Sequence, residues 1–220
     1  MKYQMKHQPS YTLLHLELAP GEQVRTEAGA MVYMSPHLGI DTRFGSGILS
    51  AIARKFLGGE SLFMNTFSAG EQGGFIGLAT GLVGDVFHYP LKGSALYVQS
   101  GSYLASSPQI DVKAQFGGLR MFFGGEGFFL LKVTGMGDLF CTSYGAIIPI
   151  DVDGTYTVDT GHIVAFEESL QFNVKRVGGW KSTFLSGEGL VCEFSGKGRL
   201  WIQSRVPGGF IGWVSKLLPR

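Results

Sequence analysis

The sequence predicts an all-β protein made of three β-sandwich or barrel-like repeats around a pseudo-threefold axis, with one or two short helices. Three observations support this class. Glycine is abundant, at 34 of 220 residues, without the collagen period. Short apolar runs alternate with a period of two, and several motifs recur in the same order three times. Scattered glycines of this kind are typical of many tight turns and bulges.

Each predicted repeat contains a glycine–glutamate motif followed by an apolar run. The glutamates are Glu60, Glu126 and Glu188, and a basic residue precedes each of them by six or seven positions. They could ring the axis and bind a cation or a partner. Alternatively, each pairs with the basic residue of its own repeat or accepts backbone N–H bonds at a tight corner. We favour the second interpretation, because a repeated corner explains a repeated residue.

Two further motifs divide the chain. One begins with a glycine that follows a turn glycine by about eight residues, and the other opens an apolar segment after the glutamate. The turn glycines are Gly21, Gly93 and Gly154, and the motifs begin at Gly29, Gly101 and Gly161 and at Gly74, Gly137 and Gly198. The chain is therefore expected to be a single compact unit, 1–220, with repeats at about 11–84, 85–145 and 146–213.

Local composition indicates which segments are strands and which are helices. Residues 95–98, 128–133, 155–158 and 190–194 are short runs of β-forming residues bounded by Gly, Asp-Gly or Pro, and are expected to be strands. Two segments instead have apolar residues at helical spacing, one in the first repeat and one at 208–218. Their apolar faces, which are candidates for partner or membrane contact, contain Leu49, Ile52 and Phe56, and Phe210, Trp213 and Leu217.

The terminal helix has two interpretations. It either docks on its own domain or a neighbouring subunit, which we favour, or lies in a membrane interface with Trp213 at headgroup depth. The longest apolar stretch is about half of the ~20 residues that a spanning helix needs. No signal-peptide core follows Met1, and Cys141 and Cys192 form no CxxC pair. We expect a cytoplasmic protein, with peripheral membrane contact as the alternative.

The composition also bears on ligands and catalysis. A net charge of +1 gives no general attraction to phosphates, so nucleic acid is not an expected partner. The five histidines contain no His-x-His pair, and no Gly-x-Ser-x-Gly elbow is present. The segment 178–183 resembles a phosphate loop, but Trp180 replaces the glycine that lets the backbone curl. We expect a protein without catalytic residues, metal or cofactor.

Seven further motifs lie at 27–32, 58–63, 84–86, 143–145, 164–167, 186–191 and 202–205. Together they are similar to those of a widespread prokaryotic family related to the mitochondrial "altered inheritance of mitochondria" proteins. The resemblance implies a fold like that of the tryptophan RNA-binding attenuation protein, present three times in one chain. It does not imply that protein's tryptophan or RNA contacts. Val83 departs from the family pattern, which has proline before the Gly-Asp turn, and this leaves the turn type open.

The resemblance also implies a kind of role, because the mitochondrial branch of the family is associated with inner-membrane organisation. We therefore expect a non-enzymatic scaffold or interaction protein, associated with a membrane or an assembly. Its expected partners are an unidentified protein and further copies of itself in a homo-oligomer, for which a trimer is the working expectation. The alternative is a small-ligand or cation-binding module with a site between repeats.

Overall fold

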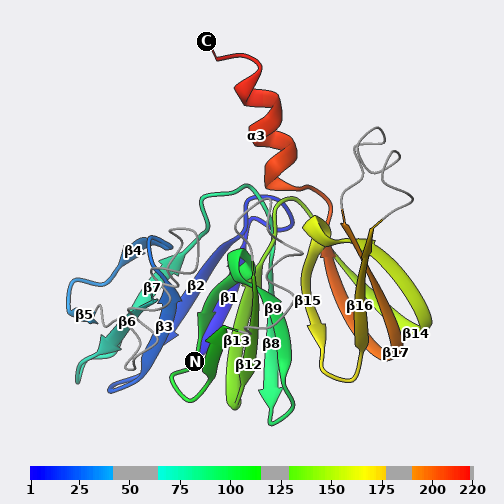
Figure 1. Ribbon diagram of the computed structural model, residues 1–220. Coiled ribbons are helices and arrows are strands. Elements are labelled where there is room, and N and C mark those ends of the chain that lie inside the picture. The colour runs from blue at the N-terminus through cyan, green and yellow to red at the C-terminus, as the bar shows by residue number, and fades with distance from the viewer. Residues whose placement is uncertain (42–63, 115–128, 177–189, 219–220) are drawn as a thin grey trace.

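The computed structural model describes residues 1–41, 64–114, 129–176 and 190–218 (Figure 1). These residues form almost entirely β-structure, with one α-helix near the C-terminal end, so the all-β prediction is confirmed. We group the described strands into three units by chain order, residues 2–78, 86–142 and 147–203. The units follow one another across the molecule, and helix α3 (Pro207–Ser215) projects from them.

The strands form three antiparallel sheets. In hydrogen-bonded order, the first contains β1 (Lys2–Lys6), β2 (Leu13–Leu18), β7 (Gly74–Leu78) and β4 (Met31–Met34). The second contains β5 (Leu38–Asp41), β6 (Met64–Ala69), β3 (Gln23–Glu27), β10 (Tyr103–Ser106), β13 (Met136–Thr142) and β8 (Val86–Lys92).

The third sheet contains β11 (Asp111–Ala114), β12 (Leu130–Thr134), β9 (Leu96–Gln99), β15 (Ile163–Glu167), β17 (Leu190–Gln203) and β14 (Ile147–Asp159), and β16 (Gln171–Arg176) also pairs with β17. Two short 3₁₀ turns, η1 (Ser100–Ser102) and η3 (Thr160–His162), lead into β10 and β15. The strands expected at 155–158 and 190–194 lie within β14 and β17. Those expected at 95–98 and 128–133 correspond to β9 and β12, which begin at Leu96 and Leu130, and residue 128 lies outside the described residues.

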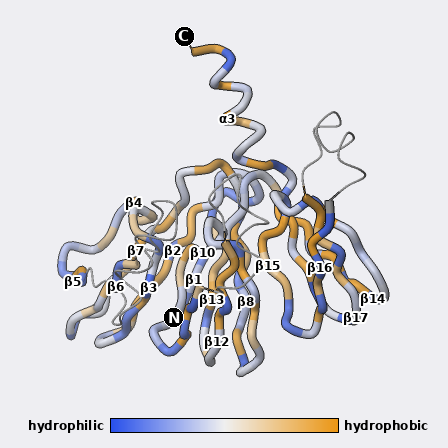
Figure 2. The backbone as a smooth tube through the Cα atoms, viewed as in Figure 1, coloured by the Kyte–Doolittle hydropathy of each residue, from blue (hydrophilic) through white to orange (hydrophobic). Residues whose placement is uncertain are grey.

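The core forms because alternate side chains of each strand point between layers. In β2, for example, Leu14, Leu16 and Leu18 are buried while the residues between them are not. Three apolar clusters result, and each includes residues of a neighbouring unit: Phe140 belongs to the first cluster, Trp201 to the second and Leu130 to the third. Figure 2 shows the corresponding mixture of hydrophobic and hydrophilic segments along the strands.

The third unit differs from the short strands that the sequence led us to expect. Its β14 and β17 are 13 and 14 residues long and pair along their whole length. Val152 and Val158, from the two halves of β14, enter the same core cluster, so the ladder curls around that core. The change of direction falls at Gly154 and Gly196, which lie opposite each other and both have positive φ.

Strand pairing recurs along the chain in the described residues. β4, β10 and β15 pair with β7, β13 and β17 respectively, and each pair contains a register shift at the same place, next to Val32, Leu104 and Val164. The glycines expected at turns, Gly21, Gly93 and Gly154, have φ values of 74°, 102° and 110°. Gly154 lies inside β14 rather than in a turn between strands. The pseudo-threefold axis and the repeat boundaries remain predictions.

Neighbouring units are joined by direct strand pairing. In the second sheet Ala105 of β10 pairs with Thr26 of β3, and in the third sheet Ala165 of β15 pairs with Val98 of β9. Among the described residues, β4 pairs only with β7, and residues 155–159 of β14 pair only with β17. The row of units therefore ends in a strand edge on each side.

Candidate functional site

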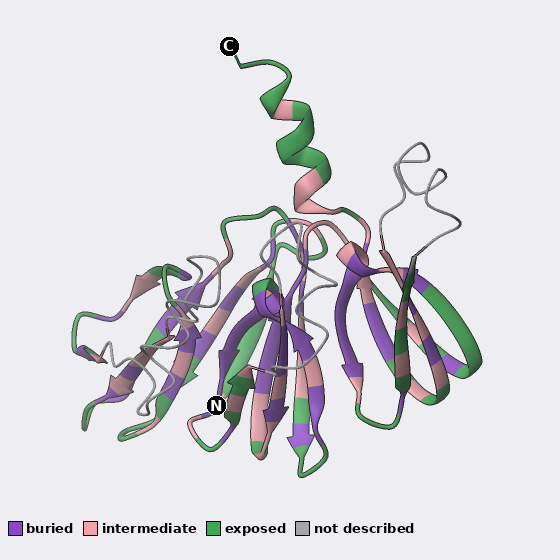
Figure 3. Cartoon of the chain, viewed as in Figure 1, coloured by how far each residue is buried: buried purple, intermediate pink, exposed green. Residues whose placement is uncertain are grey.

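Helix α3 is the most exposed apolar element of the described chain. Pro207 occupies its first turn, where the missing N–H costs no hydrogen bond, and none of its residues is buried. Phe210 and Trp213 are 48% and 60% exposed, and Leu217 just beyond the helix is 66% exposed. Figure 3 shows almost the whole helix in the colour of exposed residues.

In the described residues this helix does not bury its residues against its own domain; docking on a neighbouring subunit, the other form of docking that the sequence favours, stays a prediction. The helix leaves the end of β17 through Arg205 and Val206 and projects away from the sheets (Figure 1). Near its first turn, the ring of Phe210 lies 6.4 Å from that of Tyr144, in an edge-on arrangement. The rest of its apolar surface is left free to meet another molecule.

A hollow of about 450 Å³ lies at the foot of the helix. His162, Arg205 and the ring of Tyr144 line it on the side of the β body, while Phe210 and Trp213 line it from α3. The complete lining is Tyr144, His162, Ser204, Arg205, Val206, Gly209, Phe210 and Trp213. The Nδ1 of His162 lies 2.6 Å from the carbonyl oxygen of Gln203, which fixes the ring. The hollow combines aromatic walls with one guanidinium group.

The segment around the hollow is free of acidic residues. From Arg205 to Leu218 the chain contains no Asp or Glu, and Lys216 follows the helix directly. At ~100° per residue, Phe210 and Trp213 fall within an arc of roughly 60°, and Leu217 follows two residues after the helix ends. The helix therefore presents an apolar stripe between positively charged ends.

The other candidates from the sequence lie outside the described residues. They belong to 42–63, 115–128 and 177–189, and they are Leu49, Ile52, Phe56, Glu60, Glu126 and Glu188. The first helix and the glutamate ring therefore remain predictions. Among the residues that the structure describes, no group of three His, Cys, Asp or Glu side chains is placed to hold a metal ion.

Both cysteines are free and buried, as expected for small apolar core residues. Burial raises the pKa of the Cys192 thiol to about 12, against a weaker opposing effect of a hydrogen bond with the backbone of Asn173. Burial also raises the pKa of Cys141 strongly. Since the thiolate is the reactive form, neither side chain is suited to nucleophilic chemistry at neutral pH.

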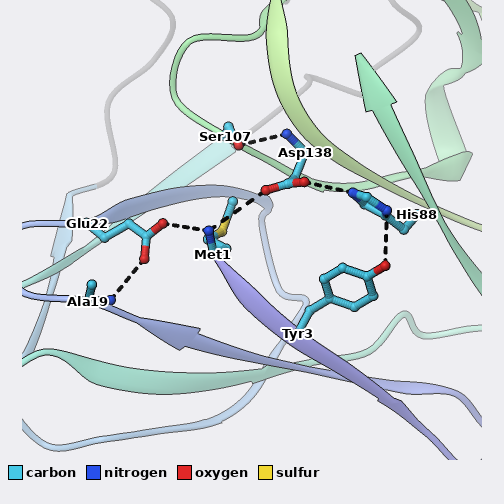
Figure 4. A network of polar contacts seen from close by, with 7 residues as sticks. All are labelled: Met1, Tyr3, Ala19, Glu22, His88, Ser107 and Asp138. Atoms are coloured by element: carbon cyan, nitrogen blue, oxygen red, sulfur yellow. Dashed lines mark hydrogen bonds and ion pairs between the residues drawn. The ribbon is translucent and has the colours of Figure 1, made fainter. Parts of the chain in front are cut away.

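A polar network that the sequence did not predict joins the first two β units (Figure 4). The Nε2 of His88 lies 2.8 Å from Asp138 Oδ1, and Tyr3 Oη lies 3.1 Å from Nδ1 of the same ring. The Met1 ammonium group lies 2.8 Å from Glu22 Oε1 and 3.9 Å from Asp138 Oδ2. Sequence spacing could not find this set, because its members come from strands and loops far apart in the chain.

The network is built to hold strands together. The backbone N–H of Asp138, in β13, donates to Ser107 Oγ at 2.9 Å, and the carboxylate of Asp138 lies between His88 of β8 and the Met1 ammonium group. Burial raises the pKa of Glu22, but hydrogen bonds from the Met1 ammonium group and the Ala19 N–H outweigh this, so that the pKa is lowered overall. Both nitrogens of His88 have partners within the network, so the ring serves as a link between strands.

Comparison with known proteins covers almost the whole chain. The sequence profile of a family described as mitochondrial biogenesis AIM24 matches residues 3–205. An uncharacterised protein of Streptococcus pyogenes serotype M6 is 29% identical over 228 residues, which span 100% of this chain and 92% of that protein. A Streptococcus pyogenes protein of known X-ray structure is 28% identical and has a TM-score of 0.82, with 99% of each chain covered. The similarity therefore extends over all three β units. Among the described residues, no helix is long and apolar enough to cross a membrane.

Proposed function

This chain belongs to the mitochondrial biogenesis AIM24 family, and from that premise we propose that it is a non-enzymatic interaction protein held at a membrane surface by helix α3. The observation that carries the proposal is the exposure of α3. The helix buries none of its residues and presents Phe210 and Trp213 to the outside. Apolar side chains gathered on one projecting element mark an interaction site.

The chemistry of the segment favours a lipid surface as the occupant. An interfacial helix buries an apolar stripe below the headgroups, places tryptophan at headgroup depth and directs cations toward anionic lipid. Phe210 and Leu217 supply the stripe with Trp213, while Arg205 and Lys216 supply the charge. The segment contains no carboxylate that anionic lipid would repel.

The size of the helix fits attachment rather than crossing. Nine residues span about 13 Å, whereas a bilayer core is about 30 Å thick. Burying three large apolar side chains contributes on the order of 5 kcal/mol. That is close to the membrane affinity of a single lipid chain, which gives reversible binding. A single chain would therefore bind weakly, and several helices on one assembly would bind firmly.

The non-enzymatic part of the proposal is supported by how the reactive side chains are used. Cys141 and Cys192 are core residues with raised pKa values. His88 and Asp138 bind each other and neighbouring strands rather than facing the hollow. These side chains contribute to the stability of the fold. We therefore assign the function to the exposed apolar surface of α3.

The experiment is co-sedimentation of the protein with vesicles of phosphatidylcholine alone or mixed with phosphatidylglycerol. We expect binding that is stronger to the anionic vesicles, with a blue shift of tryptophan emission. Phe210→Ser with Trp213→Ser is expected to abolish binding. The matched control, Tyr11→Ser with Met136→Ser, removes two exposed apolar side chains from the β body and should bind like the wild type.

Two results would count against this function. Wild-type protein that stays in the supernatant with both vesicle types contradicts the membrane assignment. Binding that survives Phe210→Ser with Trp213→Ser contradicts the assignment to α3. If the same double variant instead lost a polypeptide that co-purifies with the wild type, a protein partner would replace the membrane as the occupant of this surface.

The hollow beside α3 favours a second candidate, small-ligand binding. Its volume of about 450 Å³ lies within the range of ligand pockets, and Arg205 beside aromatic rings suits an aromatic carboxylate. Titration with benzoate tests this, because a ligand at ten times its dissociation constant stabilises the native state by about 1.4 kcal/mol. A melting temperature that rises in the wild type but not in Arg205→Gln is the expected result. An unchanged melting temperature would remove this candidate.

A further inference from the structure

We propose that copies of this chain assemble head to tail, with the β4 edge of one copy pairing with residues 155–159 of β14 in the next. The proposal goes beyond membrane attachment and does not use α3. It rests on the two unit-to-unit junctions inside the chain and on the two strand edges at the ends of the row. The occupant of each edge is a second copy of the same protein.

The junctions inside the chain follow one rule. In each junction, the residues that follow the register shift of one unit pair with a strand of the preceding unit: β10 pairs with β3, and β15 pairs with β9. In the first junction Ala105 pairs with Thr26 and Ser106 with Arg25. In the second, Ala165 pairs with Val98 and Phe166 with Tyr97. Each junction therefore extends a sheet from one unit into the next.

The same rule specifies the register of a third junction. Val32, Leu104 and Val164 occupy the equivalent register-shift position, so Tyr33 and Met34 correspond to Ala165 and Phe166. On the other side of the junction, β14 is aligned with β9 by their last residues, because Asp159 and Gln99 both directly precede a 3₁₀ turn. Val158 and Thr157 then correspond to Val98 and Tyr97. The predicted pairs between copies are Tyr33 with Val158 and Met34 with Thr157.

Burial supports a missing neighbour at the β4 edge. The register-shift residues Leu104 and Val164 are completely buried, while Val32 is 55% exposed. The residues directly before these three show the same difference: Tyr103 and Ile163 are 1% exposed, whereas Met31 is 40% exposed. These side chains differ little in polarity, so the difference comes from the unit that packs against β10 and β15 and is lacking at β4.

The opposite edge shows the same feature. Tyr156 is 42% exposed, although its equivalents at the internal junctions, Val24 and Leu96, are fully buried. Figure 1 places β4 and β14 at opposite ends of the molecule, so one chain does not bring its own two edges together. The contact is heterologous, and repeated contacts of this kind close into a ring or extend as a filament. An edge strand leaves backbone N–H and C=O groups unpaired, and proteins commonly protect such an edge from pairing with other chains. Pairing with a second copy would cover these groups.

Cysteine cross-linking of mixed copies tests the pairing directly. Met34→Cys and Thr157→Cys are made in separate chains, because cross-strand partners lie close enough for a disulfide. The two variants are co-expressed and oxidised mildly. We expect a linked dimer from the mixture and none from either variant alone. The native thiols should not interfere, since both are buried.

Each outcome decides the proposal. A linked dimer from Met34→Cys alone would indicate a β4–β4 contact between two copies and would overturn it. No link in the mixture would also overturn it, whether the edge is covered by this chain's own residues or left open. A chain carrying both substitutions is expected to give a ladder of linked multimers on denaturing gels, and the longest member of the ladder reports the number of chains in a closed ring.

A charge at the junction provides an independent measurement. Val32→Asp is expected to raise the apparent dissociation constant of the assembly at least about 100-fold, because burying an unpaired carboxylate is costly. The matched control is Val83→Asp, since Val83 is also an exposed valine but lies away from both edges. Light scattering over a dilution series gives both constants. Equal constants for the two variants would contradict the junction.

Discussion

Replacing Gly84 by alanine tests the contact that joins the end of the first unit to the end of the second. Gly84 forms a parallel bridge with Gly145, in the Gly-Asp turn that follows Val83. A β-carbon added to Gly84 would collide with the carbonyl oxygen of Ser143, which is a backbone atom. A side chain could rotate out of the way, but this carbonyl can move only if the two turns separate.

The expected loss follows from the hydrogen bonds at this bridge. Gly145 N donates to Val83 O at 2.8 Å, Asp85 N donates to Gly145 O at 3.2 Å, and Thr12 N donates to Gly84 O at 3.1 Å. Overpacking alone costs about 1–3 kcal/mol, and each hydrogen bond weakened adds about 1 kcal/mol. We expect Gly84→Ala to lower the free energy of unfolding by about 3–5 kcal/mol.

Urea denaturation followed by circular dichroism measures this loss. At a slope of roughly 2 kcal/mol/M, a loss of 4 kcal/mol moves the midpoint down by about 2 M. The control is Gly81→Ala, three residues earlier, where the added β-carbon has no atom within 4 Å and φ is not positive. That variant should be unchanged or more stable by about 0.4–1 kcal/mol. Equal midpoints for Gly84→Ala and Gly81→Ala would refute the reasoning.

Three further substitutions or treatments have defined outcomes. Glu22→Gln should cost up to about 1 kcal/mol at neutral pH. Because the folded pKa of Glu22 is lowered, the difference from wild type should begin to shrink below about pH 4.3, the unfolded value, and vanish once the pH is below the folded pKa. A difference that persists at still lower pH would contradict the ion-pair role. Cys141 and Cys192 should react with a disulfide reagent at pH 8 only after unfolding, because burial raises both pKa values; rapid labelling of the native protein would show that they are accessible. Phe194→Ala, at a fully buried site with ring contacts to Phe166 at 5.0 Å, should cost about 3–5 kcal/mol in thermal unfolding, and a loss below about 1 kcal/mol would show that the core of the third unit repacks.

The two proposals reinforce each other physically. A single α3 helix contributes an affinity of the order of one lipid chain. Head-to-tail assembly would place one such helix on every copy, and binding of linked sites to one surface multiplies the affinity without new contacts. Val32→Asp is therefore expected to weaken vesicle binding while leaving the α3 sequence intact. A variant that loses assembly but keeps full vesicle affinity would show that the two surfaces act independently.

Short-range patterns in the sequence were enough to predict the fold class and several positions where the backbone bends. Gly21, Gly93 and Gly154 were expected to be turn glycines, and all have the positive φ that other residues adopt only at a cost. The C-terminal helix could be predicted because its apolar spacing involves neighbours within three or four residues. The family resemblance also came from local motifs, and the profile match over residues 3–205 agrees with it.

Only the tertiary structure decided which equivalent residues are covered and which are exposed. Val32 and Val164 occupy equivalent positions and are the same amino acid, but one is 55% exposed and the other fully buried. The difference depends on whether another unit packs against the strand, and that unit is remote in sequence. The polar network of Tyr3, His88 and Asp138 and the projection of α3 from the body have the same cause. Local sequence determines the conformation of a segment, whereas its burial and its partners depend on long-range contacts that spacing along the chain does not encode.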